Sequence, residues 1–184
     1  DVPIVLLDLG EDPLLTLMIK KLIKIKDLHK IFIVTNEKIK PELDTWFEQI
    51  SRYYPDYAKK LKIVSDGTHT PEEKKGAVGD LLYVIEQEII KDDIIIIGGD
   101  NWFTFDLQEF VNKSKQNSPA VLVTSYRSRL NPSRFGLVEL DRNHKILKYQ
   151  EKPEQTDLLL KASCVYYINS GDLYWLKEFS KRYD

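Results

Sequence analysis

The sequence predicts an α/β protein with a mostly parallel sheet and helices on both of its faces. In roughly the first 130 residues, short apolar runs alternate with segments of helical periodicity, a pattern typical of a parallel sheet. After that point shorter strands follow one another and predict an antiparallel addition, so the sheet is mixed. The 184 residues are 42% hydrophobic and show no repeat or linker, which favours a single domain over residues 1–184.

The first elements follow from apolar spacing. Residues 4–7 form a short apolar run, and Asp12 with Pro13 then resembles an N-cap followed by a first-turn proline. Apolar side chains at helical spacing predict a helix that contains Leu14, Leu15, Met18, Ile19, Leu22 and Ile23. Residues 31–34 indicate a buried strand, residues 41–54 a helix, and residues 61–64 another short strand.

The middle of the chain repeats the alternation. Loop residues 66–71 lead to a helix whose apolar stripe contains Val78, Leu81, Leu82, Ile85 and Ile89. Four consecutive isoleucines at positions 94–97 are too few for a helix and suit a central strand that is covered on both faces. Asp106 is expected to cap a helix that continues through Val111, and residues 120–125 form a further strand.

The last third predicts antiparallel structure. Residues 136–140 and 146–150 flank a turn at residues 141–144, which indicates a hairpin. Residues 162–168 form another strand and residues 171–182 a final helix.

Composition excludes several classes of protein. The net charge of −2 argues against a generally basic nucleic-acid-binding surface. No apolar run reaches the roughly 20 residues that span a bilayer, and no basic signal-peptide region is visible at the start. The single cysteine, Cys164, excludes an internal disulfide and is expected in the core. We expect a cytoplasmic location. We also expect surface or loop positions for His29, His69 and His144.

Three segments could carry chemistry. Asp100 follows the four-isoleucine strand and Gly98-Gly99, at the carboxyl end of a strand, where ligands bind in open α/β sheets. A carboxylate there suits Mg²⁺, although a cap would explain it equally well.

The second segment is the start of the helix at residues 75–80. Gly76 and Ala77 place free N–H groups at a helix N-terminus, which suits a phosphate, and Lys74 and Lys75 add positive charge. The spacing is not that of a Walker loop, and a plain loop-to-helix junction remains the alternative.

The third segment is Glu151-Lys152-Pro153, where a carboxylate can accept hydroxyls and a lysine can bind a phosphate. An ordinary charged turn is the alternative interpretation of these residues.

Together these segments resemble the sugar-phosphate nucleotidyltransferase family, and in particular its glucose-1-phosphate thymidylyltransferase-like members. Residues 5–15 are similar to the family's "LLPVGGKPLL" segment, and residues 76–81 to its glycine-containing helix start. Residues 99–103 match "GDNxF", residues 135–141 match "YGVVExD", and residues 151–153 match "EKP". The motifs occur in the family's order.

The resemblance implies a Rossmann-like fold of the nucleotide-diphospho-sugar transferase type and the making of an NDP-sugar from an NTP and a sugar 1-phosphate. It implies that Asp100 binds Mg²⁺ and acts in catalysis, and that Gly76, Ala77, Gly99 and Asp100 contact the nucleotide. It places Gly136, Glu151 and Lys152 at the sugar phosphate, with Lys152 also catalytic. Glucose 1-phosphate with dTTP or UTP is the expected substrate pair, with no nucleic-acid or membrane partner.

The resemblance also implies that residues 1–184 lack the family's first strand, its Gly-x-Gly-Thr-Arg loop and the C-terminal end with the second metal carboxylate. The segment alone is therefore expected to be poorly active, and Cys164 replaces a common family glycine. A catalytically weakened sugar-nucleotide-binding or regulatory module of the same fold is the alternative. An NAD(P)-binding enzyme would need a Gly-x-Gly-x-x-Gly segment that residues 9–12 do not supply. The sequence does not specify the base of the NTP or the sugar of the sugar 1-phosphate. It also leaves the oligomeric state open, and a homo-oligomer is one alternative.

Overall fold

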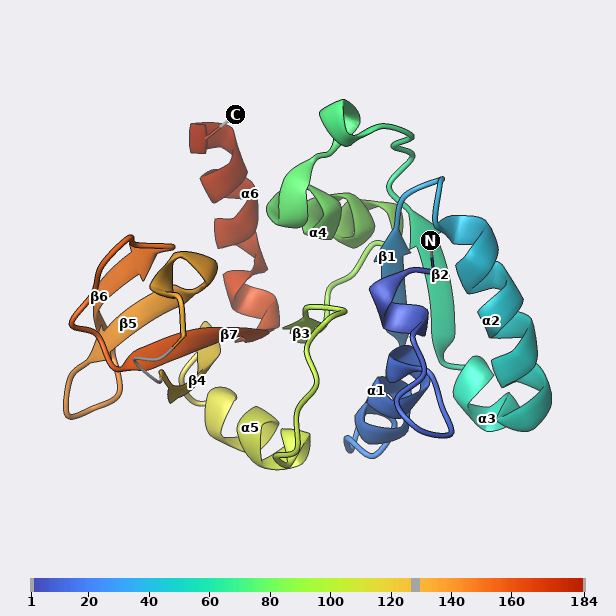
Figure 1. Cartoon of the computed structure of the whole chain (residues 1–184), viewed down its shortest axis with the longest axis horizontal. Helices are drawn as coiled ribbons and strands as arrows, with labels where there is room; N and C mark the ends of the chain where they lie inside the picture. The colour runs from blue at the N-terminus through green and yellow to red at the C-terminus, as the bar shows by residue number, and fades with distance from the viewer. Residues whose placement is uncertain (1, 127–129, 184) are drawn as a thin grey trace.

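The computed structural model describes residues 2–126 and 130–183, and its ribbon is shown in Figure 1. The strands are β1 (Ile31–Thr35), β2 (Leu61–Ser65), β3 (Ile94–Ile97), β4 (Ala120–Ser125), β5 (Gly136–Leu140), β6 (Ile146–Glu151) and β7 (Leu160–Ile168). The helices are α1 (Leu14–Leu22), α2 (Lys40–Tyr53), α3 (Pro55–Ala58), α4 (Gly76–Gln87), α5 (Leu107–Ser114) and α6 (Leu173–Tyr183). Short 3₁₀ turns are η1 (Ile4–Leu6), η2 (Pro71–Glu73), η3 (Pro132–Arg134) and η4 (Ser170–Asp172).

Strands β1 and β2 form a parallel pair, in register from Ile31 opposite Leu61 to Thr35 opposite Ser65. Helix α2 connects the two strands together with the short α3. This is the β-α-β arrangement that the alternating pattern predicts, because parallel neighbours need a crossover connection.

The second sheet is organised around β7. Its strands pair in the antiparallel sense, so the protein contains both parallel and antiparallel pairs. Strands β3, β4 and β5 each pair with β7 in the antiparallel sense, and β6 pairs with β5 as the predicted hairpin. Since β3 and β4 are both antiparallel to β7, they run in the same direction, as expected for the α/β half. They do not pair with each other, because β7 lies between them.

Helices cover both faces of β3. Ile95 and Ile97 belong to a core with side chains of α1 and α5, whereas Ile94 and Ile96 pack with α4 and α6. The expectation that both faces of this strand are covered is thus confirmed, whereas its expected central position is wrong, because β3 is at the edge of its sheet in the described part of the chain. All four isoleucines are nevertheless only half-buried, because within the described ranges β3 pairs with a single strand.

Helix α1 joins the two halves of the molecule. Leu14 and Met18 pack into the core beneath β3 and β7, while Leu15 and Ile19 pack into the core around α2. The indole Nε1 of Trp46, on α2, donates a buried hydrogen bond of 2.9 Å to Thr16 Oγ1. Figure 1 shows α1 between the β1–β2 pair and the segment that follows β3.

Several local expectations are wrong. Asp12 does not cap α1, since Pro13 occupies the N-cap position and the Asp12 carboxylate forms a 2.7 Å ion pair with Lys20. Ile89 is not on the stripe of α4, because the helix ends at Gln87 and Ile89 has a positive φ of 52° and is 71% exposed. The final helix begins after η4, so α6 starts at Leu173 rather than at residue 171.

The predicted cap of α5 is confirmed, since the Asp106 side chain accepts a hydrogen bond from the N–H of Gln108. No helix in the described ranges combines the length and apolar character that crossing a membrane requires.

Candidate functional site

A fork in the second sheet creates a pocket of about 320 Å³. On one edge of β7, β3 pairs with its C-terminal part up to Val165, whereas β5 pairs with its beginning at Leu160 and Lys161. Neither strand pairs with residues 162–164, and these three residues line the pocket. The end of β3 and the start of β5 therefore stand on opposite sides of an opening whose floor is β7.

The β3 side of the pocket carries Asp100. A tight turn brings the N–H of Asn101 to the carbonyl of Gly98 at 3.0 Å, and the N–H of Gly98 donates to the carbonyl of Cys164 at 2.8 Å. This turn anchors the Asp100 carboxylate beside the floor of the pocket. Asp100 is exposed, and its Oδ1 accepts a 3.1 Å hydrogen bond from Asn101 Nδ2.

The β5–β6 side carries Gly136 and Glu151, which lie opposite each other in the hairpin. The hydroxyl of Tyr149 donates a hydrogen bond to the Glu151 carboxylate. A Cβ at Gly136 would lie only 2.6 Å from the Tyr149 hydroxyl oxygen. Glycine is thus required at position 136 for Tyr149 to reach Glu151.

Partial burial and the Glu151 carboxylate raise the pKa of Tyr149 to about 12. The phenol therefore stays protonated at neutral pH and remains a donor to Glu151.

Lys152 extends from the end of β6 into the pocket in an unusual backbone conformation. Its φ is +45°, in the left-handed region that bulky residues rarely adopt. The N–H of Lys152 is held by the carbonyl of Phe135 at 3.0 Å, and its ammonium lies 3.7 Å from a Glu151 carboxylate oxygen. Glu151 and Lys152 thus place an acceptor and a cation side by side.

The structure brings four predicted site residues together in this pocket and leaves three outside its lining. Asp100, Gly136, Glu151 and Lys152 line it, whereas Gly76, Ala77 and Gly99 do not. Gly76 and Ala77 are exposed at the start of α4, where Gly76 has a φ of +72° and no atom within 4 Å of the position that a Cβ would take. Lys75 is tied down by a 2.8 Å hydrogen bond from its ammonium to the Asp66 carbonyl.

The carboxylate of Asp100 is the group in this pocket that fits Mg²⁺ best. Asp100 is an exposed oxygen ligand beside the side-chain amide of Asn101. No group of three His, Cys, Asp or Glu side chains that could hold a metal occurs among the described residues. Mg²⁺ is commonly bound by one or two carboxylates together with substrate phosphates, so the donor set fits an ion that arrives with a nucleotide.

Cys164 does not belong to the core, contrary to expectation. It is exposed and lines the pocket, because the face of β7 that it shares with the exposed Tyr166 is uncovered, whereas Val165 and Tyr167 on the opposite face are buried. Partial desolvation raises the pKa of its thiol, and the Asp100 carboxylate adds to this effect. The three histidines are exposed, as expected.

Sequence reasoning did not identify Arg134, Tyr149, Lys161 or Tyr166 as lining residues of the pocket. The sequence contains a signal for Tyr149, because residues two apart on a strand point to the same face of the sheet, and Tyr149 is two residues before Glu151. Lys161 carries a weaker signal, a single charge at the start of an otherwise uncharged strand.

Comparison with known proteins identifies the family of the chain. The family model described as "Nucleotidyl transferase" matches residues 2–183. A glucose-1-phosphate adenylyltransferase of Rhodopirellula baltica is 27% identical over 106 residues, which are 53% of this chain and 24% of the relative. The bifunctional protein GlmU of Methanocaldococcus jannaschii is 35% identical over 101 residues, 52% of this chain and 23% of the relative. The chain thus spans about a quarter of these curated relatives.

Two solved structures show the same fold. One, from Bacillus anthracis, is described as a glucose-1-phosphate thymidylyltransferase in complex with a sucrose. It has a TM-score of 0.76 at 21% identity, over 95% of this chain and 66% of that one. The other, an apo UDP-glucose pyrophosphorylase, has a TM-score of 0.73 at 16% identity, over 96% of this chain and 72% of that one. This likeness confirms the expected α/β fold class.

Proposed function

The chain belongs to the nucleotidyl transferase family, and on that premise we propose that it transfers a nucleotidyl group from an NTP to a sugar 1-phosphate. A phosphate oxygen of the sugar 1-phosphate attacks the α-phosphorus of the NTP. A new P–O bond forms, the bond from the α-phosphorus to the bridging oxygen breaks, and pyrophosphate leaves with that oxygen. Glucose 1-phosphate with dTTP or UTP is the first pair to test.

The observation that carries this proposal is the convergence of Asp100, Gly136, Glu151 and Lys152 on one pocket from separate segments. Phosphoryl transfer of this kind requires positioning and charge neutralisation rather than a protein nucleophile. Lys152 would hold the phosphate of the acceptor, and Glu151 would accept hydrogen bonds from sugar hydroxyls. Gly136 would act at the sugar phosphate through Tyr149, because the absence of a side chain lets Tyr149 reach Glu151.

Asp100 would hold Mg²⁺ that accompanies the NTP, and the ion when bound would neutralise charge on the phosphate oxygens. Gly76, Ala77 and Gly99 are proposed to contact the nucleotide. These three residues do not line the pocket that contains Glu151 and Lys152. This position is compatible with an NTP that extends beyond that pocket.

The test is a screen for pyrophosphate release by the full-length encoded protein, with each NTP paired with each of several sugar 1-phosphates. We expect one pair to stand out. If no pair releases pyrophosphate, the proposal fails. Tight binding of a sugar phosphate without turnover would favour the alternative of a binding or regulatory module.

The role of Lys152 is tested with the Lys152→Ala variant. We expect the KM for the sugar 1-phosphate to rise about tenfold or more, because a charged hydrogen bond to phosphate is lost, while the KM for the NTP changes little. Lys148→Ala is the matched control, since Lys148 lies on the same strand but faces Asp157 at 3.8 Å. Equal KM values for the sugar phosphate in wild type and Lys152→Ala would contradict this role.

A further inference from the structure

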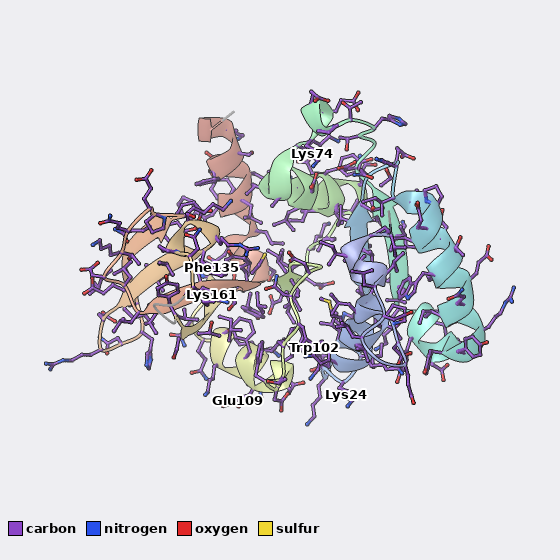
Figure 2. The ribbon with its side chains drawn as sticks, in the orientation of Figure 1. Lys24, Lys74, Trp102, Glu109, Phe135 and Lys161 are labelled. Atoms are coloured by element: carbon purple, nitrogen blue, oxygen red, sulfur yellow. The ribbon has the colours of Figure 1, made fainter. Side chains whose placement is uncertain are left out.

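Lys161 is a cation of the pocket whose position is fixed by an aromatic ring. It lies at the start of β7 and is half-buried. Its ammonium sits 4.9 Å from the centroid of the Phe135 ring, within the distance of an attractive cation–π contact. Figure 2 labels both side chains, which lie next to each other where β5 and β7 begin.

The charge of Lys161 has no carboxylate partner in the described part of the chain. The two carboxylates that line the same pocket are engaged elsewhere. Glu151 accepts from Tyr149 and lies beside Lys152, and Asp100 accepts from Asn101. The Lys161 ammonium is therefore a lining cation of this pocket that lacks a carboxylate partner in the described chain, and an anionic ligand could supply that partner.

Lys161 and Lys152 flank the start of β5 from its two sides. Lys161 lies opposite Leu137 on the β7 side, while the N–H of Lys152 bonds to the carbonyl of Phe135 on the β6 side. Because adjacent strands are about 4.8 Å apart, the two lysine backbones are separated by roughly 10 Å. Both lysines line the same pocket, and two cations in one pocket are suited to oxyanions of one small ligand.

We propose that Lys161 is a second oxyanion-binding residue of this pocket and contacts phosphate or carboxylate oxygens of the acceptor. Naming that acceptor a sugar phosphate rests on the proposed function; the anion site itself rests on the geometry. Phe135 is a positioning residue, because its ring holds the ammonium in place. The oxyanion belongs either to the 1-phosphate that Lys152 also contacts or to a second anionic group on the sugar.

Calorimetric titration without NTP or metal tests this inference on the full-length protein. The probes are glucose, glucose 1-phosphate and glucose 1,6-bisphosphate, and the variants are Lys161→Gln and Lys161→Arg. We expect Lys161→Gln to weaken binding of a phosphorylated probe about tenfold, to leave glucose unaffected, and to be largely rescued by Lys161→Arg. A loss for both phosphorylated probes identifies the 1-phosphate as the ligand group, and a loss for the bisphosphate alone identifies a second group.

Lys148→Gln is the control, since it removes a lysine of the neighbouring hairpin that lies outside the pocket lining. Wild-type affinity of Lys161→Gln for both phosphorylated probes overturns the inference, as does failure of the wild type to bind either. Anion binding that depends on Lys161, in a protein that releases no pyrophosphate, overturns the proposed function and leaves the anion site standing.

Discussion

At the scale of single residues, the pocket depends on side chains whose positions are set by backbone geometry. Lys152 adopts a left-handed conformation, and Gly136 gives Tyr149 the space to reach Glu151. Such constraints mark sites where geometry matters more than local stability. The charge of Asp100 and the space at Gly136 each lead to an expectation about substitution.

Substitution of Asp100 by Asn is expected to lower turnover by well over tenfold, where each tenfold corresponds to about 1.4 kcal/mol of barrier. The amide keeps the size of the side chain but loses the charge that would hold Mg²⁺. Steady-state kinetics in the full-length protein measure this, with Asp92→Asn, an exposed position before β3, as the control. Near wild-type turnover of Asp100→Asn would remove the metal role.

Gly136→Ala is expected to raise the KM for the sugar phosphate, because the new Cβ would press against the Tyr149 ring and hydroxyl. Removing the obstruction with a second substitution, Tyr149→Ala, should recover part of the loss. Gly171→Ala is the comparison, since its Cβ would meet only Asn169 Oδ1 at 3.4 Å. Unaltered kinetics in Gly136→Ala would show that the Tyr149 position is irrelevant to the acceptor.

At the scale of elements, helix α4 carries a half-buried carboxyl group in an unfavourable environment. Asp80 lies in its first turns, and its Oδ1 is buried without a hydrogen-bond partner among the described atoms. Burial, and then the charge of Asp66, raise the pKa of Asp80 above 3.8. As pH rises from 3.8, the unfolded chain loses this proton before the folded one, so the contribution of Asp80 to the free energy of unfolding decreases.

Asp80→Asn is therefore expected to raise the melting temperature at pH 7. At this pH the solution favours the ionised form of the wild-type carboxyl, which its surroundings in the folded protein disfavour. The gain should shrink as pH falls towards 3.8, because the wild-type group then becomes neutral too. Thermal melts of both proteins across this range provide the measurement. A gain that is constant with pH would assign the effect to something other than this charge.

Regular elements could be predicted from the sequence because their signals are local. The apolar face of α2, the cap at Asp106 and the β5–β6 hairpin all follow from spacing within a few residues. The insertion of β7 between β3 and β4 could not be predicted, since strand pairing over such separations leaves no local pattern. The pocket positions of Cys164 and Lys161 cannot be predicted from local patterns for the same reason, because the pocket forms between strands that pair with β7.

At the scale of the whole molecule, α1 makes the two sheets depend on each other. Its successive residues Leu14 and Leu15 enter different cores, as do Met18 and Ile19. Both cores therefore lose contacts when this single helix is displaced, and we expect them to unfold together.

Ile19→Ala is expected to lower the free energy of unfolding by about 2–5 kcal/mol, since Ile19 is 1% exposed and the substitution leaves a cavity. Amide exchange should speed up in β3 and β7 as well as in β1 and β2. Leu147→Ala, at a 65% exposed position, should cost no more than about 0.5 kcal/mol. Faster exchange confined to β1 and β2 would mean that the halves unfold separately.

The hairpin of β5 and β6 is fastened to β7 by two residue pairs, Leu137 with Lys161 and Val138 with Leu160. The attachment is short but buried, because Leu137 is 0% exposed and belongs to a hydrophobic cluster separate from the cores around α1. The side of the pocket that carries Glu151 and Lys152 therefore depends on a small core of its own. A substitution in that cluster is expected to disturb these two residues while the cores around α1 keep their contacts.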